Sequence, residues 1–143
     1  MTYDVMKKVA CTALALSLLT ACQTDSRNQV LSVSESQVAL RSMQSRAFDT
    51  TDKAKTQRTI IATLQDLGFV IDKADATLGT ISATKLNGYA MRMTVSVRDH
   101  GAKQTLVRAS AQYNQTAIED PQPYQQFFTA LEKAMFLTAH DAD

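Results

Sequence analysis

The chain has 143 residues, of which 15 are Lys or Arg and 14 are Asp or Glu, so its formal net charge is +1. This length suits one ordinary domain and is too short for two. A charge so close to zero argues against nucleic acid as a partner, because domains that bind it usually carry a basic surplus.

The first twenty residues have the layout of a secretory signal peptide, with Lys7 and Lys8 ahead of an uncharged run from Val9 to Leu19. As a helix this run would span roughly 16 Å, well short of the ~30 Å hydrocarbon core of a bilayer. We therefore expect no permanent membrane helix here. Asp4 dilutes the positive end of the segment, so translation starting at Met6 is an alternative to Met1.

The apolar run ends in Leu19-Thr20-Ala21-Cys22. These four residues resemble the lipobox of bacterial lipoproteins. The resemblance implies that residues 1–21 are removed as a signal peptide and that the thiol of Cys22 carries a lipid. Gln23, in place of an aspartate, implies sorting to the outer membrane. The alternative is that Cys22 is a free thiol beside an ordinary cleavage site; Cys11 does not fit the lipobox pattern.

Two or three acyl chains on Cys22 would hold the protein on the membrane essentially permanently. Loss of Lys7, Lys8 and Asp4 with the signal leaves 13 basic and 13 acidic residues. Residues 22–36 are predicted to be the lipidated cysteine and a flexible tether, whose ~14 residues span roughly 20 Å. A short strand at residues 30–33 is the alternative. The expected location is the outer membrane, on the periplasmic side, with the outer surface as an alternative.

The first structural element of the domain is expected over Val38 to Phe48, as a strand whose imperfect alternation leaves a bulge or a helical start open. Thr51 or Asp52 can cap a following helix, which should end at Gly68. An apolar stripe at spacings of three and four predicts that one side of this helix packs in the core. Its members are Ala54, Gln57, Ile60, Ile61, Leu64 and Leu67.

Strands are expected at residues 69–71 and 80–84, either as one bent strand or as a hairpin. Asn87-Gly88 favours a tight hairpin turn before a strand over residues 89–98, and a further strand covers 105–113. In these two strands Tyr89, Met91, Met93, Val95, Val97, Val107, Ala109, Ala111 and Tyr113 form the predicted buried side.

A second helix should follow Pro121 and Pro123, since proline is tolerated in a first helical turn. Its predicted core side consists of Tyr124, Phe127, Phe128, Leu131, Met135 and also Ala134. Residues 139–143 are predicted to be a frayed tail. The sequence thus predicts a single α+β domain over residues 37–138, with the order β-α-β-β-β-α and an antiparallel sheet of three to five strands covered by two helices on one face.

The other face of this sheet is expected to carry Lys85, Arg92, Arg98 and Arg108, with Arg46 or Arg41 as further candidates. One interpretation is a solvated face whose charges serve solubility. The other is a docking surface for an anionic partner, because the forked donors of arginine suit phosphates and carboxylates.

No arrangement of residues typical of catalysis is present. His100 and His140 have no cysteine, histidine or acidic partner at ligand spacing other than the adjacent Asp99 and Asp141, and adjacent residues rarely share a metal. Glu119-Asp120 is interpreted as a solvated loop. The sequence contains no glycine-rich phosphate loop, nucleophile elbow or zinc-protease motif. We expect no enzyme, no metal and no cofactor.

Two functions remain. The first is an interaction module that serves a cell-envelope assembly, such as an export or secretion system, by binding an envelope protein or an anionic envelope polymer. The second is a lipoprotein that binds a lipid or small ligand in a pocket between helix and sheet, lined by Met91 and Met93. Plain core filling is the competing account of these methionines.

Overall fold

The computed structural model describes residues 36–87, 89–136 and 139–141. The predicted signal peptide, Cys22 and the alternative strand at residues 30–33 lie outside these residues. The chain divides into two compact units, Met1–Val38 and Ala39–Asp143. Of the first unit only residues 36–38 are described, and the sheet and its helices belong to the second.

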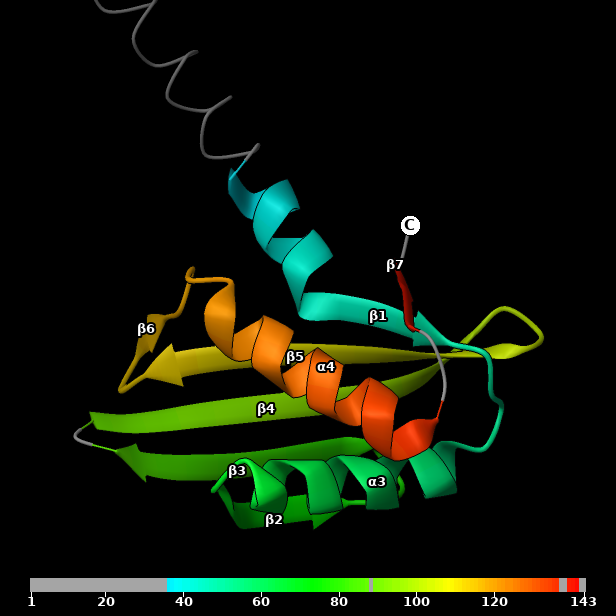
Figure 1. The fold of residues 1–143 in the computed structure, drawn as a ribbon, viewed down its shortest axis with the longest axis horizontal. Helices are drawn as coiled ribbons and strands as arrows, with labels where there is room; N and C mark the ends of the chain where they lie inside the picture. Colours follow the sequence, from blue (N-terminus) through cyan, green and yellow to red (C-terminus); the bar gives the residue numbers. More distant parts are fainter. Residues whose placement is uncertain (1–35, 88, 137–138, 142–143) are drawn as a thin grey trace, which may run out of the picture. The chain divides into compact units, whose positions relative to one another are not determined.

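An α+β architecture is confirmed, with more elements than the sequence predicted (Figure 1). Residues 36–44 are helical. The remaining elements, in chain order, are β1 (Ser45–Phe48), α3 (Lys53–Asp66), β2 (Val70–Asp75), β3 (Thr80–Asn87), β4 (Tyr89–His100), β5 (Gln104–Tyr113), β6 (Thr116–Ala117), α4 (Gln122–Met135) and β7 (Ala139–Asp141).

The strands form one seven-stranded antiparallel sheet with the order β2-β3-β4-β5-β1-β7. The short β6 pairs with the end of β5, beyond the residues that pair with β1. Helix α3 contacts β2, β3 and β4, whereas α4 contacts β5 and lies beside α3. Both helices cover the same face of the sheet (Figure 1), which we call the covered face.

The first predicted strand is wrong over most of its length, because residues 36–44 are helical and only Ser45–Phe48 pair in the sheet. Val38 is 66% exposed, whereas Leu40 packs against the core and Gln44 is buried. The two buried positions are four residues apart, which is a helical spacing. The helical start that the imperfect alternation left open is what forms.

The predicted frayed tail is also wrong where the structure describes it. Residues 139–141 form β7, which pairs with β1 in the register Phe48↔Ala139 to Arg46↔Asp141. The pairing is reinforced by side chains on both strands, since Arg46 Nη1 lies 3.4 Å from Asp141 Oδ1. The tail therefore closes one edge of the sheet.

Helix α3 begins where the sequence predicts. The carboxylate of Asp52 accepts a hydrogen bond from the Lys55 N–H (2.8 Å), and the chain leaves the helix through Gly68 at φ +85°. Ile60 and Leu64 are buried as expected, whereas Ala54 is exposed and Gln57 half-buried.

Two threonines, Thr56 and Thr63, are buried in place of Ala54 and Gln57. Each hydroxyl donates to the backbone carbonyl four residues earlier, at 2.9 Å and 2.8 Å. A threonine whose hydroxyl is satisfied in this way can bury its methyl group at little cost. The apolar pattern of the sequence could not show this.

The hairpins follow the turn signals. β2 and β3 pair antiparallel, which selects the hairpin over one bent strand, and β3 and β4 pair as far as Asn87↔Tyr89; Gly88 lies outside the described residues. The alternation of β4 and β5 is confirmed by buried Met93, Val95, Val97, Val107, Ala109 and Ala111. Tyr113, predicted to be buried, is 45% exposed because it ends β5 at the sheet margin.

Helix α4 supplies much of the core, as predicted, through Tyr124, Phe127, Phe128, Leu131 and Met135. Ala134, an expected member of this side, is exposed. The fully buried Tyr124 hydroxyl donates to the Ile118 carbonyl (2.7 Å) and accepts from the Ala111 N–H (3.2 Å) and from Gln44 Nε2 (3.3 Å). One phenol thus ties α4 to β5, to the segment after β6 and to the helical residues 36–44.

Candidate anion-binding face of the sheet

The face of the sheet opposite α3 and α4, called here the open face, carries three of the four predicted basic residues. Arg92 and Arg98 alternate along β4 with buried Met93, Val95 and Val97, so they point away from the helices. Arg108 on β5 pairs with Ser96 and is exposed like the other two. In the part of the chain that the structure describes, no helix lies on this face (Figure 1).

Lys85, the fourth predicted member, lies on the covered face. It pairs with Met91, which packs against the core, and its Nζ donates to the Leu67 carbonyl at the end of α3 (2.8 Å). The ammonium also lies 5.7 Å from the centre of the Phe69 ring. On β3 it is Ser82 and Thr84 that share a face with Arg92, so the prediction was one residue out of phase.

The two further basic candidates do not join the open face either. Arg46 pairs with buried Val107, its guanidinium lies 5.3 Å from the centre of the Phe128 ring, and its Nη1 donates to the carbonyls of Ser42 and Ser45. It therefore supports the covered side of β1. Arg41 is exposed within the helical residues 36–44 and is not part of the sheet.

The three arginines of the open face differ in their neighbours. Arg92 Nε lies 4.0 Å from Asp72 Oδ2, and the same oxygen accepts a 2.6 Å hydrogen bond from the Thr84 hydroxyl. Among the described residues, no carboxylate forms an ion pair with Arg98 or Arg108. Positive charge is therefore compensated at one end of β4 and uncompensated at the other.

Hydroxyl and amide groups fill the space between the arginines. The hydroxyls of Ser82 and Thr94 lie 3.4 Å apart, and Ser110 Oγ lies 3.4 Å from the Thr94 carbonyl. In the described residues, the register places on the open face Val70, Asp72, Lys73, Asp75, Thr80, Ser82, Thr84, Leu86, Ala90, Arg92, Thr94, Ser96, Arg98, His100, Gln104, Leu106, Arg108, Ser110 and Gln112, and beside them Ser45, Ala47, Ala117 and His140. Four of these are Lys or Arg and two are Asp, so the face is basic on a nearly neutral chain.

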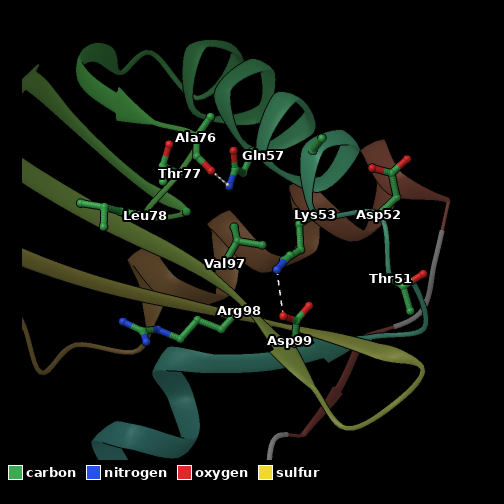
Figure 2. Close-up of a pocket in the computed structure, with 12 residues that line it drawn as sticks. Thr51, Asp52, Lys53, Gln57, Ala76, Thr77, Leu78, Val97, Arg98 and Asp99 are labelled. Carbon is green, nitrogen blue, oxygen red and sulfur yellow. Dashed lines mark hydrogen bonds and ion pairs between the residues drawn. The ribbon is translucent and has the colours of Figure 1, made fainter.

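A cleft that sequence reasoning missed lies beside the first turn of α3 and has a volume of about 760 Å³. Figure 2 shows Lys53 of α3 and Asp99 of β4 pointing toward one another across it, with Nζ and Oδ2 2.8 Å apart, while the side chain of Arg98 extends away from them. Gln57 Nε2 closes the other side by reaching to the Ala76 carbonyl (3.5 Å).

The tight approach of the β2–β3 turn to β4 shapes this cleft. Gly79 has φ +68°, its carbonyl accepts from the Val97 N–H (2.8 Å), and a Cβ on it would lie 2.5 Å from the Val97 carbonyl oxygen. Only glycine fits such a position. Gly79 is the one signal in the sequence for this region, because glycine favours a turn or a bulge, but it does not show that the turn forms the wall of a cleft.

The methionines do not line that cleft. Met93 is 1% exposed and fills the core, as the alternative of plain core filling predicts. Met91 is half-buried at a smaller depression of about 290 Å³ beside Tyr113 and Pro123. The structure therefore does not bring Met91 and Met93 together in one pocket.

His140 gains a partner that its sequence neighbours did not reveal. Its Nε2 lies 3.1 Å from Asp49 Oδ2, and Asp49 Oδ1 accepts from Gln104 Nε2 (2.8 Å). The hydrogen bond from Gln104 and then that from His140 lower the pKa of Asp49 from its usual 3.8. This exposed cluster joins β7, the segment after β1 and the start of β5. His100 lies at the end of β4 and is half-buried.

Within residues 36–87, 89–136 and 139–141, no three His, Cys, Asp or Glu side chains are grouped closely enough to hold a metal ion. The helices of this same part of the chain are too short or too polar to cross a membrane. Neither a protein-family model nor a curated protein sequence matches the chain.

Proposed function

We propose that the protein is an outer-membrane lipoprotein whose α+β domain is a non-catalytic docking module of a cell-envelope assembly, such as an export or secretion system. Leu19-Thr20-Ala21-Cys22 supports the anchor, with Cys22 as the lipidated residue. The concentration of arginine on the open face carries the docking role, because Arg92, Arg98 and Arg108 share one exposed surface. That surface contacts an anionic component of the envelope.

The anchor is tested with a matched pair of cysteine substitutions. In cells fed labelled palmitate, the natural protein and Cys11→Ser should incorporate label and sediment with outer membranes at the mature length. Cys22→Ser should lose the label and appear in the soluble periplasmic fraction, uncleaved or miscleaved. A Cys22→Ser protein that stays in membranes at the mature size contradicts the lipoprotein proposal.

The docking role is tested by reversing charge on each face of the sheet. Arg92→Glu with Arg108→Glu should abolish retrieval of one stoichiometric envelope component from detergent-solubilised membranes. Lys85→Glu, a change of the same kind on the covered face, should retain it, provided both variants unfold at similar denaturant concentrations. Equal retrieval by all three proteins would show that the open face is only a solvated surface.

A second candidate function is binding of a small ligand or lipid, which the cleft beside α3 favours through its volume of about 760 Å³. Its lining combines the Lys53–Asp99 ion pair with the exposed Leu78. Native mass spectrometry of the mature protein is the test. A bound mass that is lost on Gln57→Leu, but kept on Met91→Leu, would favour this function.

A further inference from the structure

We propose that the open face lies on the phosphate groups of the membrane that anchors the chain, with Arg98 and Arg108 as its principal contacts. The inference rests on the proposed anchor at Cys22 and goes beyond it, because it assigns an orientation to the domain and a ligand chemistry to one surface. The occupant is the headgroup layer itself.

The first argument is the arrangement of the two arginines. Arg108 pairs with Ser96, and Arg98, two residues along β4, pairs with Leu106. The two arginines are therefore diagonal neighbours on one face, at a separation of roughly 7–8 Å. Like charges so placed repel one another, and an anion between or above them removes the repulsion. The charge of Arg92 is already balanced by Asp72, since Arg92 Nε lies 4.0 Å from Asp72 Oδ2.

The second argument is what surrounds the arginines. The described residues of the open face include no Phe, Tyr or Trp, the side chains that stack on bases and that dominate the centres of protein interfaces. They include instead the hydroxyls of Ser96, Ser110 and Thr94, which donate to phosphate oxygens. The cleft of about 760 Å³ is lined by Lys53, Asp99 and Arg98, and the side chain of Arg98 extends away from the other two (Figure 2). A broad layer of phosphates fits this surface better than a single small anion.

The third argument is that weak attraction is sufficient for a tethered domain. Each basic residue near an anionic membrane favours the docked state by about fivefold, so a face with a net surplus of two favours it on the order of 25-fold. This attraction would be too weak to hold a free protein on the membrane. A lipid on Cys22, however, would keep the domain at a high effective concentration beside the membrane, because few residues separate Cys22 from the domain. In this orientation α3 and α4 face away from the membrane.

The experiment uses the mature lipidated protein reconstituted in vesicles. With Cys22 acylated and Cys11 removed, Ser110→Cys places one free thiol on the open face, and Ala62→Cys places one on the exposed side of α3. Each thiol carries an environment-sensitive fluorophore, and a headgroup-linked quencher is included in the lipid. Vesicles of phosphatidylcholine alone are compared with vesicles containing about 30% phosphatidylglycerol.

We expect quenching at residue 110 to rise at least threefold in the anionic vesicles, and quenching at residue 62 to stay unchanged. Arg98→Gln with Arg108→Gln, or about 0.5 M NaCl, should return residue 110 to its level in phosphatidylcholine. Lys85→Gln, which removes a basic residue from the covered face, should leave the threefold rise intact. Circular dichroism of each variant verifies that it is folded.

Equal quenching in both kinds of vesicle, or a rise that survives Arg98→Gln with Arg108→Gln, overturns the inference. If residue 110 ignores the lipid while the retrieved envelope protein is lost on reversing the arginines, an acidic protein occupies the face and the inference is again overturned, although the docking proposal stands. Absence of an acyl mass on Cys22, measured before reconstitution, would instead be a failure of the proposed anchor.

Discussion

The two faces of the sheet are made by alternate residues of the same strands, and they differ in almost every physical respect. Val95 is fully buried against the helices, whereas its neighbour Ser96 pairs with Arg108 on the open face. The centre of the covered face is apolar and buried. The open face carries hydroxyls, arginines and a few exposed apolar side chains such as Leu86, which is 81% exposed.

The comparison shows that the phase of each strand, rather than its composition, decides on which face a charged side chain lies and which groups it contacts. Thr84 and Lys85 are adjacent on β3, but the register places Thr84 opposite Arg92 and Lys85 opposite Met91. Lys85 consequently closes the end of α3, while Arg92 faces outward. Lys85 on the covered face thus contacts the protein's own groups, whereas Arg98 and Arg108 on the open face are exposed and form no ion pair with the described residues.

The largest predicted effect comes from placing the same charge on each face. Val95→Arg should prevent cooperative folding or cost more than about 4 kcal/mol, because it buries an unpaired charge and overpacks the core. Ser96→Arg, one residue away, should change the free energy of unfolding by less than about 1 kcal/mol. Urea denaturation followed by circular dichroism measures both. Similar losses for the two variants would show that the open face is covered in the folded protein.

The sequence was sufficient for those parts of the fold whose signals are local. The cap at Asp52, the end of α3 at Gly68 and the alternation of β4 follow from turn chemistry and from a period of two or 3.6 residues. The phase of β4 and β5 also placed Arg92, Arg98 and Arg108 correctly on one surface. Each of these residues can be assigned from its own strand or helix alone.

The remaining features depend on pairs that are far apart in the chain. Thr56 is buried because its hydroxyl finds the Asp52 carbonyl, and β7 forms because β1 offers it an edge. The link between His140 and Asp49 joins residues 91 positions apart, and no local pattern encodes it. Lys85 was misplaced although Ile81 and Ala83 alternate with polar residues, because the apolar Leu86 lies on the opposite face and is 81% exposed, which makes the pattern ambiguous at this end of β3.

A smaller difference in the free energy of unfolding is expected between alanine substitutions at two glycines. Gly79 packs against β4, whereas Gly101 lies in a turn with no atom within 4 Å of the added methyl position. Gly79→Ala should cost about 3 kcal/mol, because its methyl group would lie 2.5 Å from the Val97 carbonyl oxygen at φ +68°. Gly101→Ala, at φ +62° with no atom within 4 Å, should cost about 1 kcal/mol from backbone strain alone. Urea denaturation of both variants measures the difference, and equal losses would mean that the turn moves away from β4.

Removing the hydroxyl of Tyr124 tests whether the covered face tolerates unpaired polar groups. Among the described residues, every buried side-chain nitrogen and oxygen has a hydrogen-bond partner. Tyr124→Phe would strand the Ile118 carbonyl and the Ala111 N–H, and we expect a loss of about 1–3 kcal/mol. Tyr113→Phe, at the exposed margin of the sheet, should cost less when both are measured by chemical denaturation. The reverse order would show that water replaces the Tyr124 hydroxyl.

The smallest effect should appear at the β1–β7 edge, where exposed polar contacts add to the packing of Ala139 against the core. Hydrogen bonds from Gln104 and His140 lower the pKa of Asp49 below 3.8 in the folded chain. The ionised carboxylate therefore favours the folded state above pH 3.8, and this contribution disappears as the pH falls through the lowered value. Asp49→Asn should thus be slightly less stable than the natural protein at pH 7, and urea denaturation at decreasing pH should show this difference shrinking below pH 3.8.

Hydrogen exchange of residues 139–141 gives a local measure of the same effect, because β7 is held by this contact and by the ion pair between Arg46 and Asp141. Asp49→Asn should speed exchange there at pH 7 and leave the centre of β4 unchanged, since exposed contacts stabilise only the segment that they join. Glu119→Gln, in the segment before α4, is the matched neutralisation and should leave β7 protected. Faster exchange throughout β4 and β5 on Asp49→Asn would instead mean that this edge and the two-faced centre of the sheet unfold as one unit.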